Sequence, residues 1–357
     1  MFSRPAMPGN ERSPLTSMSV DAMSSANVEP GAHVEQGEFK LPAALRLHFG
    51  GELRNVQIAW RLEGAADAPV VLVLGGISAG RQVVANYYAN ATQGWWKEVM
   101  GPDRPLDTRN HRVLGIDFLG GSGLSTGPKV GQSDFPSISA FDQVAALQPL
   151  LAHLKISQLH AVIGASYGGM VALALGERAP QLAQRLIVIS AAHRTHPMAT
   201  AWRCVQRNIV RYAAARGEGA EGLRLARALA MATYRSPAEF ERRFAGEPER
   251  TAQGFVFPVE KYLFARGDAY AASYVPESFV CLSESIDLHR VDATQITLPT
   301  TLVAISEDQL VPLSDMQELH AQLAGPKQLI ELSSIYGHDA FLKEVEALSS
   351  VFAQALA

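Results

Sequence analysis

A serine in a glycine-rich turn is the strongest candidate for a catalytic residue in this chain. Ser166 lies within residues 164–170, which read Gly-Ala-Ser-Tyr-Gly-Gly-Met, after the apolar run 159–163 and before the helical pattern 171–178. Small neighbours permit a sharp turn from strand to helix, which exposes the serine hydroxyl above a sheet with a helix N-terminus behind it. This pattern predicts that Ser166 is a nucleophile for acyl transfer.

A serine hydroxyl becomes a good nucleophile only when a base takes its proton and an acid orients that base. The apolar run 302–305 is followed by Asp308, and the run 329–332 is followed by His338. Open parallel sheets gather such residues at the carboxyl ends of their strands. The chain order Ser166, Asp308, His338 is also that of an α/β-hydrolase triad. We therefore predict that these residues form a catalytic triad.

Two other assignments concern neighbouring acids and histidines. Glu307 is an alternative acid, but the apolar segment with Val-Pro that follows Asp308 favours Asp308, because it would carry that residue inward. His193 and His196 have a His-x-x-His spacing, but no third ligand and no helical His-Glu pattern accompanies them. No metal site is expected.

The negative oxygen of an acyl-transfer intermediate needs hydrogen-bond donors. One donor is expected to be the backbone N–H of Tyr167, which follows the nucleophile. The second is expected from the loop after an earlier strand, and the apolar run 69–74 is followed by the glycine-rich loop 75–80. We assign this second donor to the backbone N–H of Ile77. An ordinary glycine turn is the alternative.

Length and composition limit the remaining classes of function. The chain has 357 residues and 47% hydrophobic content, which suffices for one large core with an insertion. A formal net charge of −4 disfavours nucleic-acid binding, and no apolar run is long enough to cross a membrane. The two cysteines, Cys204 and Cys281, imply no disulfide framework and fit a reducing cytoplasm. The expected partners are small molecules.

Three kinds of segment are expected along the chain. Residues 1–35 are rich in small and polar residues and predict a disordered tail. Residues 36–191 and 293–357 alternate strand and helix patterns, which predicts an α/β core with a mostly parallel sheet covered by helices on both faces. Residues 192–292 show only helical patterns, which predicts a lid inserted between the strands before the acid residue. The expected strands are 56–60, 69–74, 112–117, 159–163, 185–190, 302–305 and 329–332, and the expected lid helices are 202–216, 223–234, 237–244, 259–266 and 278–289.

Motifs outside the serine turn extend over most of the chain. They are Gly94-Trp95-Trp96, residues 120–128, 168–170, 222–227, 233–236 and 259–263, Asp287-Leu288-His289, and residues 337–342. In this order they resemble the homoserine O-acetyltransferase family, which comprises homoserine and serine O-acyltransferases of the α/β-hydrolase type. The resemblance covers about residues 56–352, and several matches in order are more specific than the serine turn alone.

The resemblance implies transfer of an acyl group from acyl-coenzyme A (acyl-CoA) to the hydroxyl of L-homoserine through an acyl-serine intermediate, in methionine biosynthesis. Acyl-CoA would be a co-substrate, with no bound cofactor. By the same resemblance, Arg227 and Tyr234 hold the homoserine carboxylate and Asp339 holds its ammonium group. Their spacing of seven residues places Arg227 and Tyr234 on one helix face, and arginine offers a forked match to a carboxylate. Without the resemblance, Arg227 would be interpreted as an exposed charge on a helix, Tyr234 as a packing residue of the lid, and Asp339 as a solvated carboxylate or a helix cap.

Departures from the family pattern leave the donor and the acceptor open. Tyr167 stands where the family more usually has a methionine, so a polar ring is expected beside the acyl pocket. Acetyl-CoA is the first choice of donor. Succinyl-CoA is the alternative, with Arg81 as the candidate partner for its distal carboxylate. Serine is an alternative acceptor, and an esterase with the same triad is the rival class. The family also implies a homodimer through the lid helices, with Leu229 and Met231 as candidate contacts; packing in the core of the monomer is the alternative for both residues.

Overall fold

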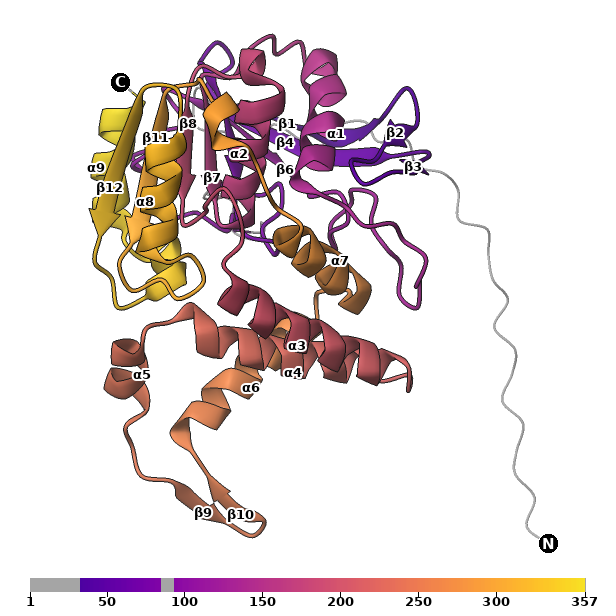
Figure 1. Ribbon diagram of the computed structural model, residues 1–357, viewed down its shortest axis with the longest axis vertical. Coiled ribbons are helices and arrows are strands. Elements are labelled where there is room, and N and C mark those ends of the chain that lie inside the picture. The colour runs from indigo at the N-terminus through magenta and orange to yellow at the C-terminus, as the bar shows by residue number, and fades with distance from the viewer. Residues whose placement is uncertain (1–32, 85–92, 357) are drawn as a thin grey trace, which may run out of the picture. The chain divides into compact units, whose positions relative to one another are not determined.

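An eight-stranded sheet forms the centre of the fold (Figure 1). The computed structural model describes residues 33–84 and 93–356. The strand order is β1-β4-β6-β5-β7-β8-β11-β12. The two pairs β1–β4 and β4–β6 are antiparallel, and the other pairs are parallel. The strands are β1 (His33–Lys40), β4 (Gln57–Gly64), β5 (Val70–Leu74), β6 (Arg112–Ile116), β7 (Ala161–Ala165), β8 (Leu186–Ile189), β11 (Thr300–Ile305) and β12 (Lys327–Leu332).

The inner parallel strands β5, β6, β7, β8 and β11 are buried on both faces of the sheet, as is usual for parallel strands. Successive residues of β5 belong to opposite layers of core: Leu72 packs in one hydrophobic cluster and Val73 in the other. The first cluster includes residues of α1 (Ala140–His153), α2 (Tyr167–Arg178) and α8 (Leu313–Gln322), and the second includes residues of α9 (Val345–Ala355). The expected α/β fold is therefore confirmed. Short elements complete this part: β2 (Leu45–Arg46), β3 (Glu52–Leu53), and the 3₁₀ helices η1 (Pro180–Leu182), η2 (Ala293–Gln295) and η3 (Gly337–Leu342).

Five helices lie between β8 and β11, where the lid was expected. In Figure 1 they lie below the sheet, with α7 nearest to it. A hairpin of β9 (Glu249–Thr251) and β10 (Gly254–Val256), which the sequence analysis did not anticipate, separates α5 from α6. Gly31–Ala357 form one compact unit, so the division into core and lid stays a prediction. The helices are α3 (Pro197–Ala214), α4 (Gly219–Tyr234), α5 (Pro237–Phe244), α6 (Pro258–Ala271) and α7 (Pro276–Asp287).

The beginning of the core differs from the expectation. Residues 33–35, assigned to a disordered tail, form the start of β1 and pair with β4. Their side chains are polar and exposed, so hydrogen bonding to β4 rather than burial orders them. The rest of the predicted tail, residues 1–32, lies outside the described residues. No helix of the described part is long and apolar enough to cross a membrane.

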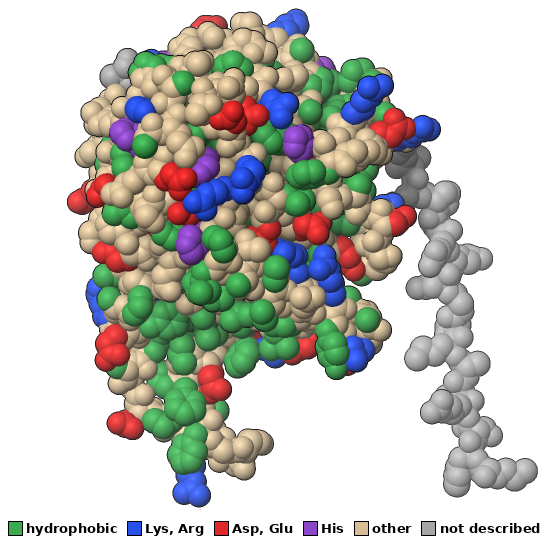
Figure 2. All heavy atoms as spheres, in the orientation of Figure 1, with side chains coloured by type: hydrophobic (Ala, Val, Ile, Leu, Met, Phe, Trp, Pro, Cys, Tyr) green, Lys and Arg blue, Asp and Glu red, His purple; other side chains and the backbone are tan. Residues whose placement is uncertain are grey.

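The lid exposes hydrophobic side chains, but only one of the two predicted contacts is among the accessible ones. Met231 is 4% exposed, so it is not available as a contact surface, whereas Leu229 is partly exposed. Figure 2 shows hydrophobic side chains gathered over the lower part of the molecule, where the lid helices and the hairpin lie. Exposed apolar residues of this region are Met198, Val205, Tyr212, Leu225, Phe255, Phe257 and Phe264. A homodimer through the lid stays a prediction.

The turn between β7 and α2 is closely packed. Ser166 has φ 55° there, in a region that side chains rarely adopt. A Cβ atom on Gly164 would lie 2.3 Å from the carbonyl oxygen of Gly168. A Cβ atom on Gly168 would lie 2.2 Å from the carbonyl oxygen of Leu74 in β5. Both glycines are therefore required by close approach of one backbone to another.

We expect Gly168→Ala to destabilise the protein by about 3 kcal/mol, because its Cβ would force two backbone segments apart. The measurement is the free energy of unfolding from denaturant titration. Gly76→Ala is the matched control, since a Cβ at Gly76 would meet nothing within 4 Å. Equal unfolding midpoints for the two variants would contradict the packing argument.

Candidate active site

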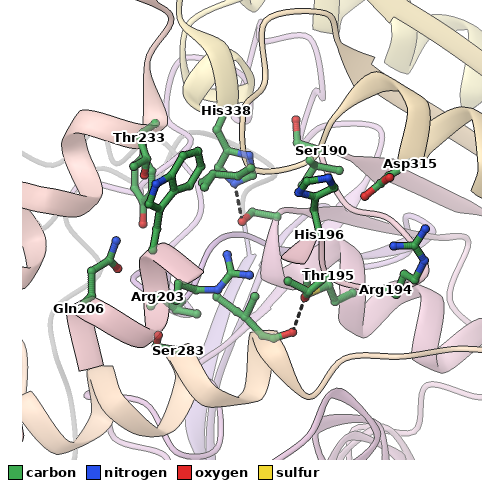
Figure 3. A pocket seen from close by; sticks show the side chains of 18 of the residues that line it. Ser190, Arg194, Thr195, His196, Arg203, Gln206, Thr233, Ser283, Asp315 and His338 are labelled. Carbon is green, nitrogen blue, oxygen red and sulfur yellow. Dashed lines mark hydrogen bonds between the residues drawn. The ribbon is translucent and has the colours of Figure 1, made fainter. Parts of the chain in front are cut away.

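The structure brings the three predicted triad residues into hydrogen-bonding contact. Ser166 follows β7, Asp308 follows β11, and His338 lies in η3 after β12. His338 Nε2 is 2.8 Å from Ser166 Oγ, and His338 Nδ1 is 2.7 Å from Asp308 Oδ2. Figure 3 shows the His338 ring directed toward the serine hydroxyl. This geometry suits removal of the serine proton by His338.

Asp308 is held rigidly in place. Its side chain is 0% exposed, and its Oδ1 accepts the N–H groups of Leu310 at 2.8 Å and Val311 at 3.0 Å. The alternative acid, Glu307, accepts hydrogen bonds from Ser333 and Ser334 instead. The apolar segment after Asp308 thus directs Asp308, and not Glu307, toward the histidine.

The charge state of His338 depends on several neighbours. Burial alone would lower the pKa of its imidazole, but Asp308, through charge and a hydrogen bond, and Asp339 together hold the pKa above the ordinary value of 6.5. The positive charge of Arg203 opposes them and lowers the same pKa. Arg203 is therefore near enough to the base to act on it electrostatically.

The two expected oxyanion donors lie beside Ser166. Tyr167 is the first residue of α2, and Ile77 lines both cavities that contain Ser166. The loop of Ile77 is fixed from the lid, since Tyr274 Oη donates a hydrogen bond to the Ile77 carbonyl oxygen at 2.8 Å. The structure shows neither N–H donating a hydrogen bond within the described part of the chain. The oxyanion role of both amides stays a prediction.

The side chain of Tyr167 does not border the acyl pocket, so that expectation was wrong. The side chain is fully buried in the hydrophobic core, and its hydroxyl contacts Ser285 Oγ at 2.7 Å and Gln143 Nε2 at 3.2 Å. Burial raises the pKa of this phenol, and the ring makes a T-shaped contact with the ring of Phe118. The tyrosine joins the core to α7 of the lid instead.

One cavity at Ser166 contains the three residues expected to bind homoserine. It has a volume of about 190 Å³ and is lined by Arg227, Tyr234 and Asp339, together with Ser166 and His338. The structure thus brings the predicted substrate-binding residues to the triad. Their roles stay a prediction.

Arg227 is a cation with no anionic partner among the residues that the structure describes. Its guanidinium carbon lies 4.6 Å from the centre of the Tyr270 ring and 5.2 Å from that of Tyr234, and Nη1 contacts Tyr234 Oη at 3.5 Å. Burial would lower its pKa, but the two tyrosines and Asp339 hold the pKa above its usual value. Within the described ranges, no carboxylate lies within 4.0 Å of this guanidinium. Asp339, by contrast, is already paired through Oδ2 with Arg235 Nε at 3.0 Å.

Arg81 is not free to bind a carboxylate, which corrects the expectation. Its backbone N–H donates to Asp117 Oδ1 at 2.8 Å, and its guanidinium forms an ion pair with Oδ2 of the same residue. Arg81 is also not among the residues that line the cavities containing Ser166. Asp117 therefore fixes Arg81 as part of the loop after β5.

A second, more enclosed cavity meets Ser166 from another direction. It has a volume of about 40 Å³, enough for about three water molecules. In Figure 3, Arg203 of α3 extends its guanidinium toward the space below His338, while Arg194 and Asp315 lie on the far side. Arg203 was not among the residues predicted from the sequence. Its weak signal there is the spacing of Arg203 and Arg207 by one helical turn.

The charges around Arg203 do not cancel. Arg203 Nε donates to Asp287 Oδ1 at 2.8 Å, and the same carboxylate also pairs with Arg207. Two cations thus share one anion. Arg203 Nη2 lies 2.7 Å from Asp287 Oδ1, yet it makes no hydrogen bond with good geometry. Arg194, on the other wall, is paired with Glu318 at 2.7 Å.

The two histidines with metal-like spacing contact other groups of the protein. His193 is buried 3.5 Å from Glu318, and His196 accepts a hydrogen bond from Met198 N–H at the start of α3. Among the residues described, no group of three or more His, Cys, Asp or Glu could hold a metal ion.

The strand order, the strained serine turn and the Ser-His-Asp geometry together define a protein of the α/β-hydrolase fold. A family model for the alpha/beta hydrolase fold matches residues 69–345. Among solved structures, esterase E22 has a TM-score of 0.80 at 22% identity, covering 91% of this chain and 100% of that chain. Homoserine O-acetyltransferase from Bacillus anthracis has a TM-score of 0.80 at 19% identity, covering 90% and 97%. These likenesses show the fold alone.

Sequence relatives narrow the assignment. A homoserine O-succinyltransferase of Xanthomonas campestris is 38% identical over 344 residues, 96% of this chain and 89% of that protein. A serine O-succinyltransferase of Litchfieldella anticariensis is 34% identical, covering 89% and 97%. A homoserine O-acetyltransferase of Thermobifida fusca is 30% identical, covering 89% and 93%. Within the α/β-hydrolase fold, the chain therefore belongs to the family of homoserine and serine O-acyltransferases.

The pKa of His338 leads to a prediction about pH. Only the neutral imidazole accepts the serine proton, so acylation should rise with pH through this pKa, with a midpoint above 6.5. Asp339→Asn should move the midpoint to lower pH, because it removes a charge that stabilises the imidazolium. The measurement is kcat/KM against pH with an uncharged ester such as 4-nitrophenyl acetate. A midpoint at or below 6.5 in the unchanged protein would contradict the assignment of His338 as the base.

Proposed function

We propose that the protein is a homoserine O-acyltransferase that moves an acyl group from acyl-CoA to the hydroxyl of L-homoserine. The observation that carries the proposal is Arg227, a half-buried cation beside the Ser166–His338 pair with no carboxylate partner among the described residues. A cation that is partly removed from water favours a ligand that pairs with it. The carboxylate of an amino-acid substrate would supply the missing partner, and the names of the relatives agree with such a substrate.

In the first half-reaction, His338 Nε2 accepts the proton of Ser166, and Oγ attacks the thioester carbonyl. The N–H groups of Tyr167 and Ile77 stabilise the negative oxygen. The carbon–sulfur bond then breaks, and the departing CoA sulfur takes the proton from His338. Asp308 stabilises the imidazolium during this step. The product is an ester on Ser166.

In the second half-reaction, the homoserine hydroxyl gives its proton to His338 and attacks the ester. The ester bond to Ser166 breaks, and Oγ recovers the proton. Arg227 and Tyr234 hold the carboxylate of the acceptor. Asp339 uses Oδ1 for the ammonium group, because its Oδ2 is engaged by Arg235. This arrangement orients the hydroxyl for attack.

The two cavities at Ser166 have different roles in this scheme. The cavity with Arg227 receives the acceptor and, earlier, the thioester. The small cavity with Arg203 holds the acyl group, since it is enclosed and ends at the serine. An esterase would need neither Arg227 nor Asp339. The assignment to methionine biosynthesis, the cytoplasm and a homodimer remains part of the proposal.

Succinyl-CoA is a second candidate donor, and Arg203 favours it over acetyl-CoA. A succinyl group carries a carboxylate at the end away from the thioester. On acylated Ser166 that carboxylate would lie in the cavity that Arg203 enters, and the shared ion pair of Arg203 and Arg207 with Asp287 leaves a positive charge to receive it. The homoserine O-succinyltransferase relative at 38% identity agrees with this choice.

The first experiment measures release of free CoA from acetyl-CoA and succinyl-CoA, each with homoserine, with serine and with neither. We expect release that depends on homoserine and that Ser166→Ala abolishes, because the acyl group must pass through the serine. Arg227→Met should lower kcat/KM for the acceptor about 10- to 100-fold, as expected for loss of a charged hydrogen bond. The burst of CoA in the absence of acceptor should persist in this variant. Steady CoA release without any acceptor would favour the esterase instead.

The donor preference is tested with Arg203→Met. At a pH well above the pKa of His338, the effect of Arg203 on that pKa leaves the imidazole neutral in both proteins. There we expect kcat/KM for succinyl-CoA to fall about 10- to 100-fold and that for acetyl-CoA to change little, since only the former has a carboxylate to lose its partner. In this variant Asp287 still accepts hydrogen bonds from Arg207 and Thr200, so we expect the fold to be retained. Arg194→Met, in the same cavity but paired with Glu318, is the matched control. Equal losses with both donors would overturn this role of Arg203.

A further inference from the structure

A third cavity, outside the triad, is lined mainly by cations. It has a volume of about 320 Å³ and lies where α5 and α6 of the lid face the loop after β12 and the end of η3. Its size falls in the range of small-molecule sites. The lining residues are Arg235, Glu239, Arg242, Arg243, Tyr262, Arg266, Ile335, Tyr336 and Lys343.

The positive charge of this basic cavity is only partly neutralised. Glu239 is its one lining carboxylate, and it pairs with Arg235 at 3.1 Å and Arg243 at 3.0 Å. Arg235 is also paired with Asp339. The excess is local, because the chain as a whole has a formal net charge of −4. Within the described part of the chain, three lining cations have no carboxylate within 4.0 Å: Arg242, Arg266 and Lys343.

Two tyrosine rings hold guanidinium groups in this cavity without removing their charge. The guanidinium carbon of Arg243 lies 4.5 Å from the centre of the Tyr262 ring, and that of Arg266 lies 5.6 Å from it. Arg235 lies 5.5 Å from the centre of the Tyr336 ring. Such contacts orient arginines while leaving their N–H groups for an anion.

The basic cavity adjoins the active site. Arg235, in its wall, forms the ion pair with Asp339, which lines the acceptor cavity. Lys343 follows directly on Leu342, which lines the acceptor cavity as well. A ligand bound among these cations would therefore lie next to the cavity through which a thioester reaches Ser166.

We propose that the basic cavity binds the phosphate groups of the acyl-CoA donor. This inference rests on the proposed acyltransferase function. CoA joins a neutral, flexible pantetheine arm, which carries the thioester, to a nucleotide with a diphosphate and a 3′-phosphate. The protein has the same two parts: the basic cavity could hold the charged nucleotide, and the adjoining cavity with the triad could hold the thioester. Arginine and lysine are the side chains that bind phosphates in such sites.

The test uses Arg242→Gln, Lys343→Gln and the double variant. Neither side chain makes a hydrogen bond or ion pair to a described residue, so the fold should be unaffected. We expect KM for acyl-CoA to rise about 3- to 5-fold in each single variant and about 10-fold or more in the double variant, with kcat unchanged. KM for the same acyl group on pantetheine, which lacks the nucleotide, should not change. Acyl-dephospho-CoA should fall between the two.

Binding of free CoA, measured by calorimetry, separates this inference from the proposed function. If the unchanged protein binds CoA more tightly than pantetheine and the double variant loses that difference, the cavity binds the phosphates even if no transfer occurs. Lys261→Gln is the matched control, since Lys261 is on α6 but pairs with Glu249 and does not line the cavity. Unchanged CoA affinity in the double variant, or equal losses for CoA and pantetheine, would overturn the proposal. Added inorganic phosphate or ATP that competes as well as CoA would show a general anion site and would also overturn it.

Discussion

The backbone conformation of Ser166 is the constraint on which the rest of the site depends. For a residue with a side chain, a backbone angle φ of 55° costs about 1–3 kcal/mol, so the surrounding structure has to hold Ser166 in this conformation. Gly164 and Gly168 make this possible, because backbone oxygens occupy the space that their side chains would need. β7 lies inside the sheet between β5 and β8, which brings the loops after β5, β11 and β12 toward this turn. The acid, the base and the expected oxyanion loop are therefore arranged around one serine by the strand order.

Charge balance around His338 adds a second constraint. Burial and Arg203 disfavour the imidazolium, and Asp308 and Asp339 favour it. Arg227 faces the same serine from the other cavity, half-buried against tyrosine rings. Removing a cation from water without an anion is costly, and in the proposed function the carboxylate of the acceptor offsets that cost when it binds. The proposed affinity for an acidic ligand thus rests on side chains that the triad itself does not use.

The sequence was most informative where the signal is local. Ser166, Asp308 and His338 each follow a predicted strand, and the predicted strands differ from the observed ones by a few residues at most. The sequence failed where a contact joins distant segments. Tyr167 bonds Ser285, 118 residues away, and Asp287, which fixes Arg203, is 84 residues from it. No local pattern indicates such partners, because only the packing of α7 against α2 and α3 creates them. The hairpin β9–β10 was missed because its strands have three residues each and expose most of their side chains.

Esterases and acyltransferases of this fold share the serine chemistry, and solved structures of both have a TM-score of 0.80 with this chain. The outcome depends on whether water or an alcohol reaches the acyl-serine first. Orientation of a bound acceptor raises its effective concentration by many orders of magnitude, to about 10⁵ M or more in favourable cases. Such orientation needs fixed charges at both ends of the acceptor, and in the proposed function Arg227 of α4 and Asp339 of η3 supply them. On this proposal the sheet sets the chemistry of the serine, whereas the lid and the loop after β12 decide which molecules take part in it.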